Sequence, residues 1–239
     1  MFFGLFWGDW TILLIIPGFL FSLWAQLRVN MAVERYKSVT LRPGMTGAAV
    51  ARRILDSNGL SHVRIEEVPG ELSDHYDPRT KVLRLSATSC HSNSVAAVGI
   101  AAHEAGHAIQ HGKSYPFLRL RMAMVPVCNI GSNLAMPLFF IGLLLSYSAS
   151  YLSTPLMVAG IAAYGLAVLF QLVTLPVEFN ASRRAMRCLS GSGTMSESEL
   201  KGARSVLWAA AMTYVAALAT GLLSLLRLVL IVGNHSRRR

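Results

Sequence analysis

Residues 122–177 read MAMVPVCNIGSNLAMPLFFIGLLLSYSASYLSTPLMVAGIAAYGLAVLFQLVTLPV and contain no charged side chain. A helix that crosses a bilayer once needs about 20 predominantly apolar residues. The stretch is much longer than one crossing and fits two helices, with the Ser- and Tyr-rich residues 146–155 as the turn between them. It therefore predicts an apolar hairpin that returns the chain to the side of the membrane from which it left.

Two more apolar runs lie outside this hairpin. Residues 5–27 are rich in Leu, Ile, Phe and Trp and end at Arg28, and residues 205–232 carry one charge, Arg227, near their end. The whole chain is 53% hydrophobic and 14% charged, whereas soluble domains carry about a quarter charged residues. We therefore expect a mainly α membrane protein with about four transmembrane helices and a short basic tail at residues 233–239.

Residues 28–121 have the composition of a soluble domain and carry signals for both helices and strands. Thr46 is a good N-cap, and Ser92 and Ser94 precede a second helical pattern that runs to about residue 111. Residues 62–68 are typical of a strand. Residues 82–86 alternate apolar and basic side chains, which predicts an edge or hairpin strand that could bind a peptide by strand addition.

The chemistry of the chain centres on His103-Glu104-Ala105-Gly106-His107, an H-E-x-x-H motif. On a helix, positions i and i+4 share a face, so both imidazoles can bind one zinc ion. The adjacent Glu104 then faces the metal-bound water and acts as its general base. Gly106 costs about 1 kcal/mol relative to Ala inside a helix, which is reasonable if another segment approaches the helix closely at that point.

A catalytic zinc site uses three protein ligands and leaves a fourth position for water. Glu178 is the only acidic residue between Glu104 and Glu197, and the hairpin returns it to the side of the motif. We expect it to be the third ligand, within a segment of residues 178–204. His111 continues the i+4 spacing, but a straight helix carries it past the ion.

Ser182 lies one turn beyond Glu178 on the same helical face and could orient a ligand by a hydrogen bond. An oxyanion formed during catalysis needs a donor opposite the zinc. His75 and Tyr76, in a loop before the strand at 82–86, are the candidate donors. The alternative is a structural turn in which Asp74 and Asp77 bond nearby backbone amides.

The chain resembles the YugP-type family of neutral zinc metallopeptidases, bacterial membrane proteins of about this length. The resemblance implies a small α+β, gluzincin-like metallopeptidase domain over residues 28–121 at the membrane surface, with one catalytic Zn²⁺ on His103, His107 and Glu178. Many better-studied gluzincins have an Asp at the position of Ser182. The similar stretches run in order along nearly the whole chain: residues 51–56, 72–78, 82–86, 102–104, 106–111, 175–183 and 211–217.

Two other functions remain open from the sequence. A site-2-type intramembrane protease also uses H-E-x-x-H, but within a membrane span and with an Asp ligand from a second span. Here Lys81, Arg84 and Lys113 flank the motif. A catalytically silent scaffold with a structural zinc would need a fourth protein ligand, which His75 or His111 could supply.

The net charge of +10 suggests lipid rather than nucleic acid, because the basic residues flank apolar runs. We expect peptide or protein substrates, some of them membrane-associated. Residues 28–121 and 183–204 hold most of the 22 Lys and Arg residues, which places both segments and the active site in the cytoplasm of a bacterial plasma-membrane protein. The basic tail favours the opposite orientation.

The three cysteines are Cys90, Cys128 and Cys188. They are widely separated, odd in number and form no C-x-x-C pair. This argues against a disulfide framework and against a cysteine zinc site.

Overall fold

The computed structural model describes residues 10–41, 44–148 and 151–236. Within these residues, four helices are long and apolar enough to cross a membrane: Trp10–Lys37, Pro116–Ser148, Ser153–Gly191 and Glu197–Asn234. This confirms the expected mainly helical fold with four candidate membrane-spanning helices. The predictions for residues 5–9 and for the end of the tail, residues 237–239, lie outside the described residues.

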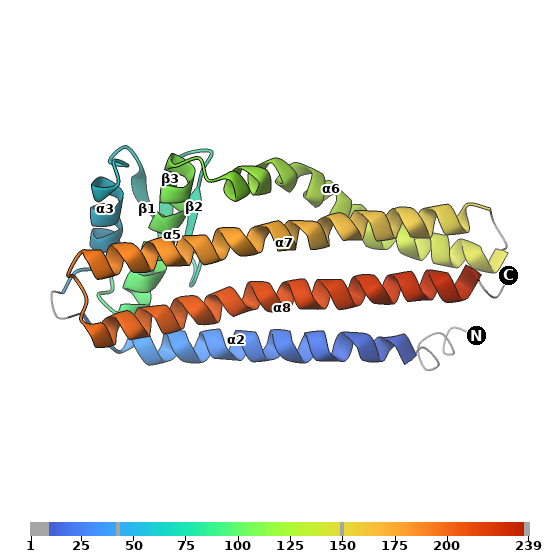
Figure 1. Ribbon diagram of the computed structural model, residues 1–239, viewed down its shortest axis with the longest axis horizontal. Coiled ribbons are helices and arrows are strands. Elements are labelled where there is room, and N and C mark those ends of the chain that lie inside the picture. Colours follow the sequence, from blue (N-terminus) through green and yellow to red (C-terminus); the bar gives the residue numbers. More distant parts are fainter. Residues whose placement is uncertain (1–9, 42–43, 149–150, 237–239) are drawn as a thin grey trace. The chain divides into compact units, whose positions relative to one another are not determined.

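One compact unit consists of Met1–Trp24, Leu120–Thr174 and Tyr214–Arg239. Helices α6 (Pro116–Leu145) and α7 (Ser153–Gly191) form the predicted hairpin, with the short 3-10 turn η2 (Ser146–Ser148) after α6 (Figure 1). A Cβ added at Gly160 would lie 2.7 Å from the Ala135 carbonyl oxygen. The backbones of α6 and α7 thus approach as closely as small residues permit, a common way of packing helices in lipid.

The same unit also holds contacts between the first and last long helices of the chain. Helix α2 (Ile15–Lys37), preceded by η1 (Trp10–Leu14), packs on α8 (Glu197–Ser236). Thr220 Oγ1 donates to the Gly18 carbonyl at 2.9 Å and lies 3.0 Å from Ser22 Oγ. Such hydrogen bonds fix how far α2 and α8 are shifted along each other, because lipid hydrocarbon cannot hydrogen-bond to the polar groups.

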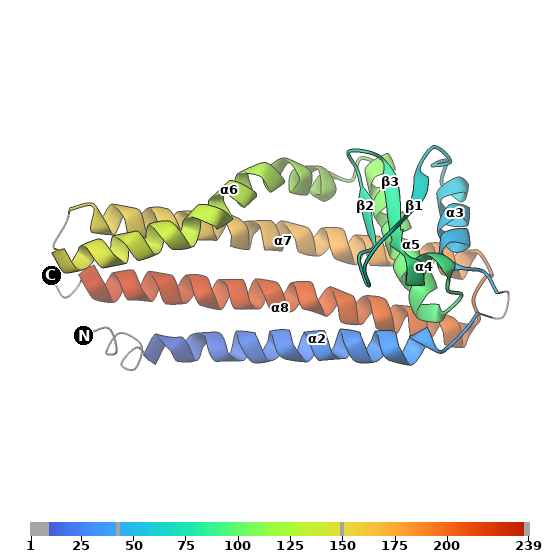
Figure 2. The same ribbon diagram turned by 180° about the vertical axis from the view of Figure 1, so that it is seen from behind.

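The second compact unit consists of Ala25–Arg119 and Leu175–Thr213. It contains α3 (Gly47–Ser57), a small sheet, α4 (Ala87–His91) and α5 (Val95–Gly112), and Figure 2 shows α4 beside α5. Thr46 and Ser94 cap α3 and α5 by accepting from the backbone N–H groups of Ala49 and Ala97, which confirms the predicted helix starts.

The sheet has the order β1 (Arg64–Val68), β3 (Val82–Ser86), β2 (His75–Asp77). β1 is parallel to β3 and β2 is antiparallel to it. Of the two alternatives predicted for residues 82–86, an edge or a hairpin strand, the structure shows the hairpin strand, because β3 is central and pairs antiparallel with β2. Arg84 forms ion pairs with Glu66 on one neighbouring strand and Asp77 on the other.

The core of this unit lies between α3, the sheet and α5. It also takes up the C-terminal part of α7 and the N-terminal part of α8, through Leu189 and Leu207. Apart from its polar motif residues, α5 is built of small and branched apolar side chains that are almost entirely buried. Helix α5 is thus held on several sides, which gives the side chains it carries a fixed position.

Candidate metal centre

Helix α5 presents His103 and His107 from one face, as the i, i+4 spacing predicts. Their side chains are 15% and 12% exposed, and their rings meet edge to face with centroids 4.8 Å apart. Two imidazoles this close and this buried need a common partner for their inner nitrogens.

That partner is Glu178, on α7 and only 3% exposed. Its Oε2 lies 3.3 Å from His103 Nε2 and 3.5 Å from His107 Nε2. A Cβ added at Gly106 would lie 2.5 Å from the Ala181 carbonyl oxygen. Gly106 therefore allows α7 to approach α5 at the motif, as the sequence analysis expected.

The three side chains match the donor set of a zinc site. Zinc–ligand distances of about 2.0–2.2 Å in a tetrahedron separate the ligand atoms by roughly 3.4 Å. The two observed separations from Glu178 Oε2, 3.3 and 3.5 Å, match this spacing. Each residue offers one ligand atom, and the three atoms lie within 4.8 Å of one another. The two contacts of Glu178 thus have the spacing expected between ligands of one metal ion.

The outer nitrogens of both rings are engaged, which orients the inner ones. Gln110 is fully buried, and its Nε2 donates to the Val177 carbonyl at 2.7 Å and to Asn180 Oδ1 at 3.1 Å. Its Oε1 is thereby fixed as an acceptor for His107 Nδ1–H at 3.0 Å. His107 Nε2 then carries a free lone pair, the form that binds a metal.

Ser182 Oγ lies 3.1 Å from His103 Nδ1 and can orient that ring by a hydrogen bond. The sequence indicated this partner but not Gln110. The signal was present, because Gln110 is three residues after His107 and residues at i and i+3 are neighbours on a helix surface. A buried side-chain amide also needs polar partners.

Glu104 lies beside the triad, and its Oε2 accepts from the Tyr76 backbone N–H at 2.9 Å. Burial raises the pKa of Glu104 to about 7, against the lowering effect of His103, and the negative charges of Glu178 and Asp74 add to the rise. A carboxyl group with a pKa near neutrality can both accept and release a proton under ordinary conditions.

Tyr76 and His75 point to opposite sides of β2. Tyr76 Oη lies 2.9 Å from His111 Nδ1, and burial raises the pKa of Tyr76 to about 12. The His75 side chain is exposed, and its Nδ1 lies 2.8 Å from the Ser73 carbonyl oxygen. The structure therefore brings Tyr76 to the motif helix, whereas the His75 ring lies away from it. Asp77 accepts from the nearby Arg79 backbone N–H, as in a structural turn, whereas Asp74 accepts from the backbone N–H of Ser86, twelve residues further along the chain.

A cavity of about 460 Å³ continues from Tyr76 along the C-terminal turns of α5. Its ionisable lining includes His62, Lys81, His111 and Lys113 and no carboxylate. Lys81 has a φ of 55°, an uncommon conformation for a residue with a side chain. The cavity can accept a negatively charged or hydrogen-bonding group.

The sequence model of the family described as "Putative neutral zinc metallopeptidase" matches residues 11–233. The chain belongs to this family. It is also 46% identical over 223 residues to the Bacillus subtilis (strain 168) protein named "Putative membrane protease YugP", and the alignment covers 93% of this chain and 96% of that relative. The resemblance identified from the sequence is thus confirmed.

No solved structure matches the chain. The gluzincin-like character of residues 28–121 therefore stays a prediction. Family membership implies zinc, and the group of His103, His107 and Glu178 is a place where the chain can bind it.

Proposed function

We propose that this protein is a membrane-anchored zinc metallopeptidase in which His103, His107 and Glu178 hold one zinc ion. The observation that carries the proposal is the contact of one Glu178 oxygen with the inner nitrogens of both histidines, at 3.3 and 3.5 Å. Membership of the neutral zinc metallopeptidase family supports it, and so does the relative named as a membrane protease.

Glu104 is the general base. A zinc ion held by these residues would supply Lewis acidity and make water easier to deprotonate. Glu104 would accept a proton from the attacking water and deliver it to the leaving amine of the peptide. Its Oε2 is held by the Tyr76 N–H, which leaves Oε1 for the proton. The raised pKa of the buried carboxyl group favours this uptake.

The substrate peptide lies beside β2. Peptide binding by strand addition at residues 82–86 is not possible, because β3 is the central strand and pairs with β1 on one edge and β2 on the other. β2 is an edge strand, and the backbone of Tyr76 is hydrogen-bonded to Glu104. An extended peptide along this edge would bring its carbonyl next to the base.

Tyr76 is better supported than His75 as the donor that stabilises the oxyanion. Tyr76 reaches α5 and has its hydroxyl oriented by His111 at 2.9 Å. A phenol with a pKa of about 12 stays protonated throughout the physiological range and can donate a hydrogen bond. His75 is exposed on the other side of the strand.

The two alternative functions have less support. A structural zinc site would be closed by a fourth protein ligand, but His75 and His111 have other partners and the described donor group has three members. An intramembrane protease of the site-2 type would use an Asp ligand, whereas the third donor here is Glu178. We further propose a bacterial plasma-membrane location with the site facing the cytoplasm, on the charge distribution of the sequence.

Cleavage of peptides by the purified zinc-loaded protein tests this function. We expect wild type to cleave members of a quenched-fluorescence peptide library and Glu104→Gln to lose about 100- to 10,000-fold in kcat/KM with its zinc retained. Glu197→Gln, at an exposed carboxylate at the start of α8, is the matched control and should keep full activity. Equal activity in Glu104→Gln and wild type would rule out the proposed base.

A further inference from the structure

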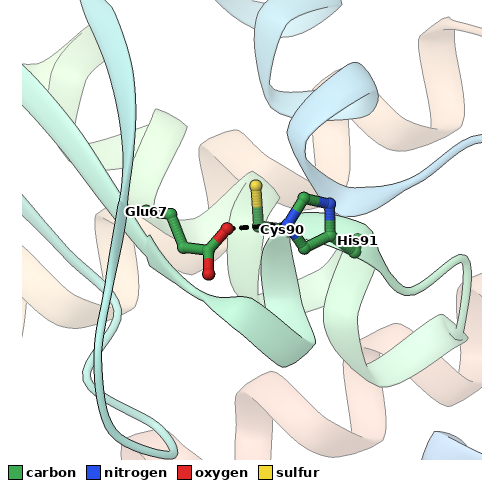
Figure 3. Close-up of side chains that lie close together, drawn as sticks. All are labelled: Glu67, Cys90 and His91. Atoms are coloured by element: carbon green, nitrogen blue, oxygen red, sulfur yellow. Dashed lines mark hydrogen bonds and ion pairs between the residues drawn. The ribbon is translucent and has the colours of Figure 1, made fainter.

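A second group of side chains of metal-ligating type lies in the same unit. Glu67, Cys90 and His91 bring a carboxylate oxygen, a sulfur and an imidazole nitrogen within 4.8 Å of one another. Figure 3 shows the three side chains close together, with Cys90 beside the contact that joins the Glu67 carboxylate to the His91 ring, at 2.7 Å. None of the three belongs to the site that contains Glu104.

The topology of the sheet explains why these distant residues meet. β1 and β3 are parallel neighbours, and the register pairs Glu67 with Leu85 and Val68 with Ser86. The two strands therefore end at the same edge of the sheet. Helix α4 starts immediately after Ser86, which serves as its N-cap. Residues on this five-residue helix are thus carried to the end of β1 and to Glu67.

The chemistry of the group suits a borderline divalent cation. Thiolate, imidazole and carboxylate are all zinc ligands, with bond lengths of about 2.3, 2.0–2.1 and 2.0–2.2 Å. A bound cation would take the place of the thiol proton of Cys90, which would then bind as a thiolate.

We propose that Glu67, Cys90 and His91 bind a second divalent cation of the zinc type. The fourth position is left for water, because the described group has three members. Glu67 and His91 would separate from 2.7 Å to the roughly 3.4 Å that a tetrahedral ion requires. Both side chains are about half or more exposed and can move.

The ion would act as a clip between the end of β1 and α4. It closes the loop of residues 67–90, and this loop contains β2, whose Tyr76 N–H bonds to Glu104. Closing a loop through a metal restricts the open forms of the segment. Occupancy of the second site thereby stabilises one wall of the site with the H-E-x-x-H motif. The proposal does not depend on peptidase activity.

Cobalt(II) titration of the metal-free protein tests the second site directly. Cobalt replaces zinc at such sites, and only a cysteine ligand gives a thiolate-to-cobalt charge-transfer band in the near ultraviolet. His103, His107 and Glu178 include no sulfur. We expect the first equivalent to give no such band, the second to produce it, and amide hydrogen exchange over residues 67–90 to slow as it grows.

Four variants decide the assignment. The band should vanish in Cys90→Ser, and it should require at least tenfold more cobalt in Glu67→Gln. It should persist in Cys188→Ser, which removes a cysteine outside the group, and in His103→Ala, which disables the other site. Absence of the band in wild type at saturating cobalt, or its survival in Cys90→Ser, would overturn the proposal. A failed peptidase assay would leave these results unchanged.

Discussion

The two donor groups of this protein differ in how well the fold prepares them for a metal. His103, His107 and Glu178 are 15%, 12% and 3% exposed, and the contacts from Glu178 are already spaced for a tetrahedral ion. Glu67 and His91 are 48% and 72% exposed and touch at 2.7 Å. The contacts of Glu178 with His103 and His107 already have the spacing of metal ligands, whereas Glu67 and His91 must move apart to bind an ion.

The hydrogen bonds around each group deepen the contrast. Gln110 and Ser182 orient the rings of His107 and His103 from behind. Within the described residues, the ring of His91 has one hydrogen-bond partner, which is Glu67 itself. A preorganised site loses less conformational entropy when the metal binds. We therefore expect the buried group to bind metal first, and the occupancy of the exposed group to vary with metal concentration.

Removing one carboxylate from each group should give the largest difference. Glu178→Gln should weaken tight zinc binding by more than the roughly 100-fold attributed to loss of an orienting hydrogen bond. Glu67→Gln should leave the tight zinc in place. Chelator competition with metal analysis measures both. If Glu178→Gln kept its tightly bound zinc, Glu178 would not be a ligand of the tight site.

Two glycines of α5 test whether the close approach of α7 shapes the buried group. An added Cβ at Gly106 would lie 2.5 Å from the Ala181 carbonyl oxygen, whereas one at Gly99 would lie 3.5 Å from Ala203 Cβ. We expect Gly106→Ala to push the helices apart, lower stability by about 1–3 kcal/mol and weaken zinc binding.

Gly99→Ala is the matched control, because its new methyl group makes an ordinary contact. It should keep zinc affinity and gain up to about 1 kcal/mol of helix stability. Thermal unfolding in detergent and zinc titration would measure the pair. Equal zinc affinity in both variants would show that α7 is not held against α5 at the motif.

Loss of the Ser182 hydroxyl should have a smaller effect. Ser182→Ala removes the hydrogen bond to His103 Nδ1 and should weaken zinc binding by about 10-fold, the lower end for such a partner. Ser190→Ala is the control, since Ser190 is exposed and its Oγ donates to the Arg187 carbonyl of its own helix. An unchanged zinc affinity in Ser182→Ala would show that the Ser182 hydroxyl does not orient the His103 ring for metal binding.

The smallest effect concerns the pH dependence of the metal-free protein. The pKa of Glu104 is raised from 4.5 to about 7 by burial. The folded state therefore holds the proton more tightly than the unfolded state, and stability is highest below the unfolded pKa and falls as pH rises toward and through about 7. Glu104→Gln should remove this decline, and Glu197→Gln should retain it. If the melting temperatures of wild type and Glu104→Gln changed in parallel from pH 5 to 8, the raised pKa of Glu104 would be contradicted.

Most of the fold that the sequence predicted rests on local signals. Uncharged length predicted the spans, capping residues predicted the starts of α3 and α5, and the i, i+4 histidines predicted a shared helical face. The hairpin also predicted that Glu178 would return to the motif, and Gly106 predicted a close approach. These features depend on periodicity and length, which a sequence displays directly.

The features that were missed depend on distant pairing. The alternating pattern of residues 82–86 left an edge strand and a hairpin strand both open, because the sequence does not show that Arg84 pairs with Glu66 and Asp77 on two different strands. Glu67 could not be matched with Cys90 and His91 without the parallel register of β1 and β3. Cysteine spacing had argued against any cysteine metal site, because that rule covers cysteine pairs and not mixed ligands.

Zinc X-ray absorption on protein loaded with one equivalent of zinc tests the central claim most directly. The account predicts a shell of nitrogen and oxygen atoms alone at about 2.0–2.2 Å, with the outer signals of two imidazoles. The same spectrum is expected for Glu104→Gln, because Glu104 is a base and not a ligand. A sulfur at about 2.3 Å, or a spectrum that keeps both imidazole signals in His107→Ala, would contradict zinc binding by His103, His107 and Glu178.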